Sequence, residues 1–237
     1  MNTHTDTIFR SNLYKLLSTG FRYPDPEIFK TFQNGEFLDE LMYNISSISG
    51  LNALMLEYSG MAGNHKDDMK GMTMAQFEIE FTRIFDAGTP VPLCPPNESH
   101  YCRKPGSVVM LEVSEFYNFF GMRMSQEEGK REFPDHICAE LEFLHFLTFR
   151  EEEALGEDKL EEYKGYLLAQ KDFLERHLIQ WIPEFCLKLQ DSASLTFYVR
   201  LGQITSRFIS SEFELVTANL HSFNPKNKIL ASAGFPD

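Results

Sequence analysis

The sequence predicts an all-α protein, and three observations predict it. Apolar side chains recur at three- and four-residue spacing along most of the 237 residues. No alternating apolar and polar run is bounded by hairpin turns, which a β-sheet would require. Glycines and prolines mostly separate the periodic segments. We therefore expect a helical bundle of about ten helices in a single domain, 1–237, with a minor division near 59–73 or 121–132 as the alternative.

The N-terminal third is expected to hold three helices. The first carries an apolar stripe and ends near Gly20. Asp25 is expected to cap the second helix, because Pro26 then occupies the first helical position, where a missing N–H costs nothing. A third helix is expected over 36–58, and the glycine-rich, charged stretch 59–73 is expected to be a loop.

The middle of the chain alternates helix with proline-rich loop. Helical periodicity resumes at Met74 and cannot continue through residues 90–102, PVPLCPPNESHYC, because proline lacks the helical N–H donor. The next helix is expected from Val109 to Phe120, with Gly121 as its C-cap.

The C-terminal half is predicted to be helical almost throughout. A long helix is expected from Ile137, followed by a helical segment that Pro183 breaks or kinks. A last helix is expected over 194–212, with an irregular tail over 213–237.

Composition and charge narrow the classes of function. Hydrophobic residues make up 43% of the chain, which is typical of a globular protein, and the formal net charge is −13. That charge disfavours nucleic acids and anionic membrane surfaces and favours positively charged partners. No signal peptide and no apolar run long enough to span a membrane is evident, so we expect a cytoplasmic protein with reduced cysteines.

Metal and thiol chemistry has weak support. Cys94, His100 and Cys102 offer two thiolates and an imidazole, but structural zinc sites use short paired spacings that are missing here. Pairing of Cys138 with a nearby histidine is more often packing than catalysis. No nucleophile elbow or phosphate loop is present. We expect neither enzyme activity nor a metal site, and keep an enzyme using Cys94, His100 and Cys102 as the alternative.

The segment FPDHICAELEFL has a more specific pattern. Pro134 and Asp135 open a helix, where an N-cap role accounts for the aspartate completely. His136 and Glu140 share one face of that helix, so an imidazole lies near two carboxylates. Such a corner suits a cationic or hydrogen-bonding ligand, and the structural and ligand-binding interpretations both stay open.

Three segments in order resemble one family. EFTRIF with PPNESHY, FPDHICAELEFL and KDFLERHLIQWIPEF are similar to segments of the TorD/DmsD/NarJ family of cytoplasmic chaperones for molybdenum-cofactor oxidoreductases, over about residues 5–212. The resemblance implies an all-helical fold, no catalysis and a role in anaerobic respiration. Such proteins bind the leader, often a twin-arginine signal, or the apo form of a catalytic subunit until its cofactor is inserted, and proofread it before export.

The resemblance also implies a binding site. Ile84 and Phe85 would form an apolar groove wall, a proline-rich loop would adjoin it, and the turn before Ile137 would supply a polar corner. Glu98 and Glu140 are added as acidic partners, from charge and proximity in sequence. The predicted leader- or apoenzyme-binding residues are Ile84, Phe85, Pro95, Pro96, Glu98, Ser99, Tyr101, Pro134, Asp135, His136 and Glu140.

Some family members carry tryptophan where this chain has Asn97, while its only tryptophan, Trp181, is expected to be structural. No cofactor of its own is expected, and the guanine nucleotide or molybdenum cofactor contact associated with some members has no phosphate loop to support it. The expected partner is a molybdenum-containing oxidoreductase catalytic subunit or its leader, bound by a monomer or a domain-swapped dimer. A stable accessory subunit is the alternative.

Overall fold

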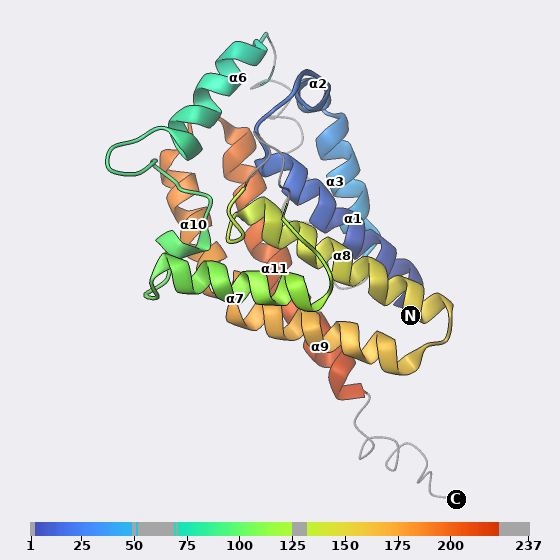
Figure 1. Ribbon diagram of the computed structural model, residues 1–237. Coiled ribbons are helices and arrows are strands. Elements are labelled where there is room, and N and C mark those ends of the chain that lie inside the picture. The colour runs from blue at the N-terminus through green and yellow to red at the C-terminus, as the bar shows by residue number, and fades with distance from the viewer. Residues whose placement is uncertain (1–2, 49–50, 52–68, 70, 125–131, 223–237) are drawn as a thin grey trace, which may run out of the picture.

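The described part of the chain is built from α-helices (Figure 1). It contains nine α-helices and no strand, and its one β element is an isolated bridge between Asn97 and His136. The predicted all-α class is therefore confirmed. None of the described helices is long and apolar enough to cross a membrane. This computed structural model describes residues 3–48, 51, 69, 71–124 and 132–222.

Among the connections that the structure describes in full, α1 to α2, α2 to α3 and those from α8 to α11 are short, while a long proline-rich loop precedes α7. A π-helical turn (Thr82–Asp86) extends α6, and a 3₁₀ turn (Glu98–His100) lies within that loop. The α-helices are α1 (Thr3–Phe21), α2 (Pro26–Asn34), α3 (Glu36–Ser46), α6 (Met74–Phe81), α7 (Gly106–Phe119), α8 (Ile137–Gly156), α9 (Leu160–Arg176), α10 (Leu178–Ser192) and α11 (Thr196–Ser222).

The helices pack around one apolar core. Helix α1 lies along α8, α8 packs against α9, and α10 packs against α11, as Figure 1 shows. Buried side chains from Leu13 in α1 to Ile209 in α11 belong to a single cluster that is rich in phenylalanine. The two stretches considered for a domain division, 59–73 and 121–132, lie largely outside the described residues, so the single domain stays a prediction.

Several predicted helix boundaries are confirmed by their caps. The Asp25 carboxylate accepts hydrogen bonds from the backbone N–H groups of Glu27 and Ile28, at 2.9 and 2.8 Å, and Pro26 begins α2. Gly121 follows α7 with φ +75°, a backbone conformation that side chains with a Cβ rarely adopt.

Three other boundaries differ from the prediction. Helix α3 ends at Ser46, and most of 47–58 lies outside the described residues. The break in the C-terminal half falls at His177, while Pro183 lies inside α10, which continues past it. Helix α11 extends to Ser222 because Val216 is buried in a small cluster with residues of α8 and α9, so 213–222 is helical.

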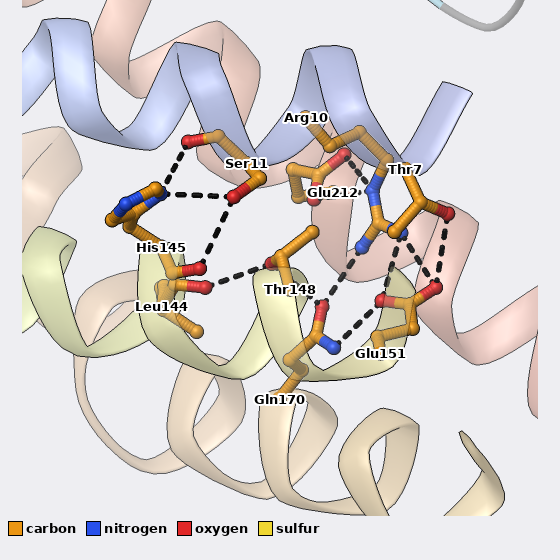
Figure 2. A network of polar contacts seen from close by, with 9 residues as sticks. All are labelled: Thr7, Arg10, Ser11, Leu144, His145, Thr148, Glu151, Gln170 and Glu212. Carbon is orange, nitrogen blue, oxygen red and sulfur yellow. Dashed lines mark hydrogen bonds and ion pairs between the residues drawn. The ribbon is translucent and has the colours of Figure 1, made fainter. Parts of the chain in front are cut away.

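A buried ionic network joins four helices near the middle of the bundle (Figure 2). Arg10 of α1 donates from Nε to Glu212 of α11 at 2.9 Å and from Nη1 to Glu151 of α8 at 3.0 Å. Its Nη2 donates to Gln170 of α9 at 2.8 Å. Burial alone would lower the pKa of Arg10, but the two carboxylates outweigh it and raise that pKa. The guanidinium is therefore charged, and all three of its nitrogens are bonded.

Candidate functional site

Two sequence-distant segments meet at the start of α8 (Ile137–Gly156). The backbone N–H of Glu98 donates to the carbonyl of Asp135 at 2.9 Å, and the N–H of Ile137 donates to the carbonyl of Pro96 at 2.8 Å. This short antiparallel pairing brings the proline-rich loop against the turn before α8. The structure thus places together two of the motifs from which the sequence predicted a common site.

The Asp135 side chain fixes this junction from inside. It is 1% exposed, and its carboxylate accepts from the backbone N–H of Ser99 at 3.1 Å and from the Asn97 amide at 3.4 Å. The N-cap of α8 is the next residue, because His136 Nδ1 accepts the N–H of Cys138 at 3.2 Å. The N-cap interpretation of Asp135 is therefore wrong, since its carboxylate holds the loop.

His136 lies half-buried at the accessible side of the junction. Burial lowers the pKa of its imidazole, which keeps the ring neutral and leaves Nδ1 free to accept the helix N–H. Beside it, the Tyr117 hydroxyl donates to the Pro134 carbonyl at 2.9 Å and fixes the turn against α7 (Gly106–Phe119). The corner is therefore held in place, and it presents His136 beside the exposed side chain of Phe133.

A cluster of acidic and aromatic groups lies beneath the loop. Glu98 is 4% exposed, and its Oε2 is 2.9 Å from Nδ1 of buried His177. Glu140 is fully buried, and its Oε2 accepts from the Trp181 indole at 3.0 Å. Burial raises the pKa of Glu140, and the neighbouring Glu98 charge raises it further. We call Glu98, Glu140, His177 and Trp181 the carboxyl cluster.

This burial contradicts the prediction that Glu98 and Glu140 would face a cationic partner. Both carboxyl groups are shielded from solvent and bonded to groups of the same chain. Within the described residues, Oε1 of Glu140 and Nε2 of His177 are buried without a hydrogen-bond partner. The cluster is thus incompletely satisfied, which is uncommon in protein interiors.

The predicted apolar groove wall is also buried. Ile84 is 0% and Phe85 3% exposed, because the π-helical turn that carries them points both into the core. The Phe85 ring contacts Phe185 and Tyr198 at centroid distances of 6.4 and 5.2 Å. These side chains, together with buried Pro95 and Pro96, support the site from below and offer no groove surface.

Tyr101 connects the loop to α10 (Leu178–Ser192). Its hydroxyl donates to the Pro95 carbonyl at 2.9 Å, and its ring stacks on Trp181 at 5.6 Å. Lys188 Nζ lies 5.7 Å from the centre of the same ring. Of the predicted site residues, only four keep part of their surface accessible, and we call these the accessible corner: Ser99, Tyr101, Pro134 and His136.

Cys94 is poorly placed for thiol chemistry. The Cys94 thiol is buried and donates to the Phe185 carbonyl at 3.6 Å, and burial raises its pKa to about 11. The protonated form dominates at neutral pH, and a thiol is a poor nucleophile and a poor metal ligand. His100, which was grouped with it, lies exposed on the surface.

One other grouping of possible metal ligands occurs in the described residues. Atoms of Glu132, His136 and Cys138 lie within 4.8 Å of one another. The Cys138 thiol donates to the Ser18 carbonyl at 3.3 Å, and burial raises its pKa. His136 Nδ1 already serves as the helix cap. Both groups are committed to structural hydrogen bonds, so the grouping does not fit a metal well.

Comparison with known proteins identifies the family. The model of the nitrate reductase delta subunit family matches residues 52–187. The perchlorate reductase assembly chaperone protein of Dechloromonas aromatica (strain RCB) is 30% identical over 224 residues, which cover 91% of this chain and 93% of that protein. The chain belongs to the TorD/NarJ family of redox enzyme maturation proteins.

Two other relatives lie in the same TorD/NarJ family. The selenate reductase assembly chaperone protein of Thauera selenatis is 37% identical over 98 residues, 40% of this chain and 49% of that protein. The chaperone protein TorD of Aliivibrio fischeri is 25% identical over 207 residues, 86% of this chain and 91% of that protein. The family resemblance expected from the three motifs is therefore confirmed.

Proposed function

We propose that this protein is an assembly chaperone for the catalytic subunit of a molybdenum-containing oxidoreductase. It binds the leader or the apo form of that subunit in the cytoplasm, assists cofactor insertion and proofreads the subunit before export. The observation that carries the proposal is the nearly end-to-end similarity to a perchlorate reductase assembly chaperone. The protein acts by binding and catalyses no reaction of its own.

The accessible corner supports a binding role. Its loop is pinned by the Asp135 carboxylate and by the stacking of Tyr101 on Trp181, so little conformational entropy is lost when a partner docks. The net charge of −13 attracts and orients a basic leader. Half-buried His136 and Ser99 then offer polar groups for recognition at close range.

The experiment uses the catalytic subunit of a candidate molybdenum-containing oxidoreductase from the same organism. This subunit is produced with and without the chaperone, and molybdenum is measured in the purified subunit. We expect the chaperone to co-purify with the apo subunit and to raise the molybdenum content. Equal molybdenum content together with no co-purification would contradict the proposal.

Variants locate the binding site on the chaperone. His136→Ala and Tyr101→Ala are expected to weaken binding of the apo subunit by roughly tenfold each, since central aromatic and polar contacts dominate interfaces. The matched control is Tyr43→Ala, because Tyr43 is 63% exposed on α3 (Glu36–Ser46). Calorimetry with the leader peptide and with the leaderless subunit shows which part of the partner is bound.

A further inference from the structure

A groove lies between α7 (Gly106–Phe119) and α9 (Leu160–Arg176), lined by side chains of both helices. It encloses about 750 Å³, and Figure 1 shows the two helices lying side by side along it. The helices run antiparallel, because the ring of Phe120 is 6.1 Å from Tyr166 while Phe116 is 5.2 Å from Phe173. The start of α7 therefore lies beside the end of α9 at one end of the groove, and the end of α7 lies beside the start of α9 at the other.

One end of the groove is apolar and open. Phe119 is 84% exposed, the largest exposed fraction among the exposed large apolar side chains, and Leu168 across the groove is 50% exposed. A Cβ atom added to Gly165 would meet no other atom within 4 Å, so the wall at this glycine faces open space. Exposed aromatic and aliphatic side chains around a hollow are typical of a surface that binds another protein.

The other end of the groove is lined by charged side chains, and one of its acidic residues makes no ion pair within the described residues. Arg176 lies 5.0 Å above the Phe116 ring and pairs with Asp172 at 3.4 Å. Lys171 and Glu112 are also paired, with Glu175 and with Lys104, at 2.6 Å each. Glu115 lines the same end and makes no ion pair within the part of the chain that is described. An incoming cation therefore finds an unpaired carboxylate here.

We propose that this groove docks a partner segment in which arginines or lysines stand next to an apolar run. The basic residues lie at the Glu115 end, and the apolar run lies along Phe119 and Leu168. The inference rests on the proposed function, since a leader of the twin-arginine kind has this order of residues. It also supplies the apolar surface that buried Ile84 and Phe85 cannot provide.

Photo-crosslinking tests which molecule occupies the groove. Benzoyl-phenylalanine replaces Phe119 in the full chain, which is mixed with the apo catalytic subunit and irradiated. The control position is Phe149 on α8, which is 48% exposed. We expect Phe119 alone to crosslink, and mass spectrometry to place the crosslink in an apolar segment next to basic residues. Crosslinks to a second copy of this chain, or to a partner segment without that pattern, would overturn the inference.

Two variants test the groove independently of crosslinking. Gly165→Leu fills the groove without a clash at Cβ, so the fold is retained while binding of the apo subunit falls by roughly tenfold or more. Glu115→Gln is expected to weaken binding at low salt and to reduce its salt dependence. Leu187→Ser is the control, because Leu187 is 65% exposed on α10.

The two proposals fail in different ways. If the unmodified chaperone captures the subunit and Gly165→Leu captures it equally well, the groove inference is wrong and the proposed function stands. If the unmodified chaperone captures neither the leader peptide nor the apo subunit, the proposed function is wrong and the inference falls with it. Circular dichroism of each variant confirms that loss of binding does not come from unfolding.

Discussion

Two buried polar clusters in this bundle differ in how well their charges are compensated. In the Arg10 network, one guanidinium lies between the carboxylates of Glu151 and Glu212, and each of its nitrogens donates a hydrogen bond. In the carboxyl cluster, Glu98 and Glu140 lie close together, the described residues give them no arginine or lysine partner, and Glu140 Oε1 and His177 Nε2 make no hydrogen bond. The carboxylates of the first cluster share a buried arginine, and those of the second do not.

The positions of the two clusters in the bundle suggest why their charges are compensated differently. The Arg10 network joins α1, α8, α9 and α11 within the bundle, where complete hydrogen bonding favours a single packing. The carboxyl cluster lies under the proline-rich loop, whose other face is the accessible corner. An incompletely satisfied group in a native protein calls for an explanation, and proximity to the proposed binding surface is one. We infer that the hydrogen bonds of Arg10 stabilise the fold, and that the packing around Glu140 can rearrange more easily.

Removing Arg10 is expected to have the largest effect on this comparison. Arg10→Met leaves two buried carboxylates without their cation, which costs about 3–5 kcal/mol of unfolding free energy. Urea denaturation measures the loss at neutral pH. The loss is expected to shrink in mild acid, because protonation of Glu212, whose pKa burial raises, then removes part of the uncompensated charge.

A surface arginine provides the control for that prediction. Arg150 pairs with Glu153 on α8 with both side chains well exposed, so Arg150→Ala is expected to cost under about 1 kcal/mol. If Arg10→Met costs no more than Arg150→Ala, the network contributes little, and the contrast between the two clusters is lost.

Asp135→Ala is expected to give the next largest loss. It leaves the partly buried N–H of Ser99 without its side-chain acceptor, which costs about 1–3 kcal/mol. Because the loop is no longer pinned, binding of the apo subunit should weaken as well. Asp135→Asn keeps one side-chain oxygen acceptor and is expected to retain more of both properties. Equal effects of the two substitutions on unfolding would show that this acceptor is not what holds the loop.

Glu140→Gln is expected to stabilise the protein. The raised pKa of Glu140 means that the folded state favours the protonated carboxyl. Stability is therefore greatest below the ordinary carboxyl pKa and falls as pH rises towards the raised value. Glutamine imitates the protonated form, accepts from Trp181 and can donate to Glu98. We expect a gain of about 1–2 kcal/mol at pH 8, and a flatter dependence of unfolding free energy on pH.

The pH series is interpreted as a difference between variant and wild type. Burial also raises the pKa of Glu212, so both proteins keep a slope of the same sign from that residue. Parallel curves for the two proteins would contradict a strained carboxyl at Glu140. A curve that flattens only in the variant assigns the strain to the carboxyl cluster.

Features of the fold that depend on neighbouring residues were predicted from the sequence, and features that depend on packing between distant segments were missed. The Asp25 cap and the Gly121 stop depend on neighbouring residues, so the sequence displays them directly. The break at His177 and the continuation of α11 to Ser222 depend on what each segment packs against. Pro183 is tolerated inside α10, a position that sequence rules treat as a break.

The candidate site shows the same contrast between features set by local sequence and features set by distant residues. The motifs correctly brought the proline-rich loop to the start of α8, yet exposure could not be inferred from residue type. Glu98 is buried because His177, far along the chain, provides its partner. Acidic residues are usually exposed, so the sequence favoured an accessible Glu98. The groove between α7 and α9 was missed because its apolar residues look like the core positions of an ordinary helix.

The smallest expected effect separates charge from neutral hydrogen bonding in the Arg10 network. The Thr148 hydroxyl bonds the Leu144 carbonyl at 2.8 Å and lies 3.3 Å from Gln170 Oε1. Thr148→Val removes this hydroxyl at nearly constant volume, and Gln170 still accepts from Arg10. We expect a loss of about 0.5–1 kcal/mol in urea denaturation.

Thr205→Val is the matched control, because Thr205 is equally buried and its hydroxyl makes the same bond to the carbonyl four residues earlier in α11, at 2.7 Å. The difference between the two valine variants isolates the contact with Gln170. If that difference is a few tenths of a kcal/mol while Arg10→Met costs several, the network is stabilised by its compensated charges. If the Thr148 contact with Gln170 contributes as much as the Arg10 charge, neutral hydrogen bonds stabilise the network, and the carboxyl cluster differs from it in leaving one oxygen of Glu140 without a donor.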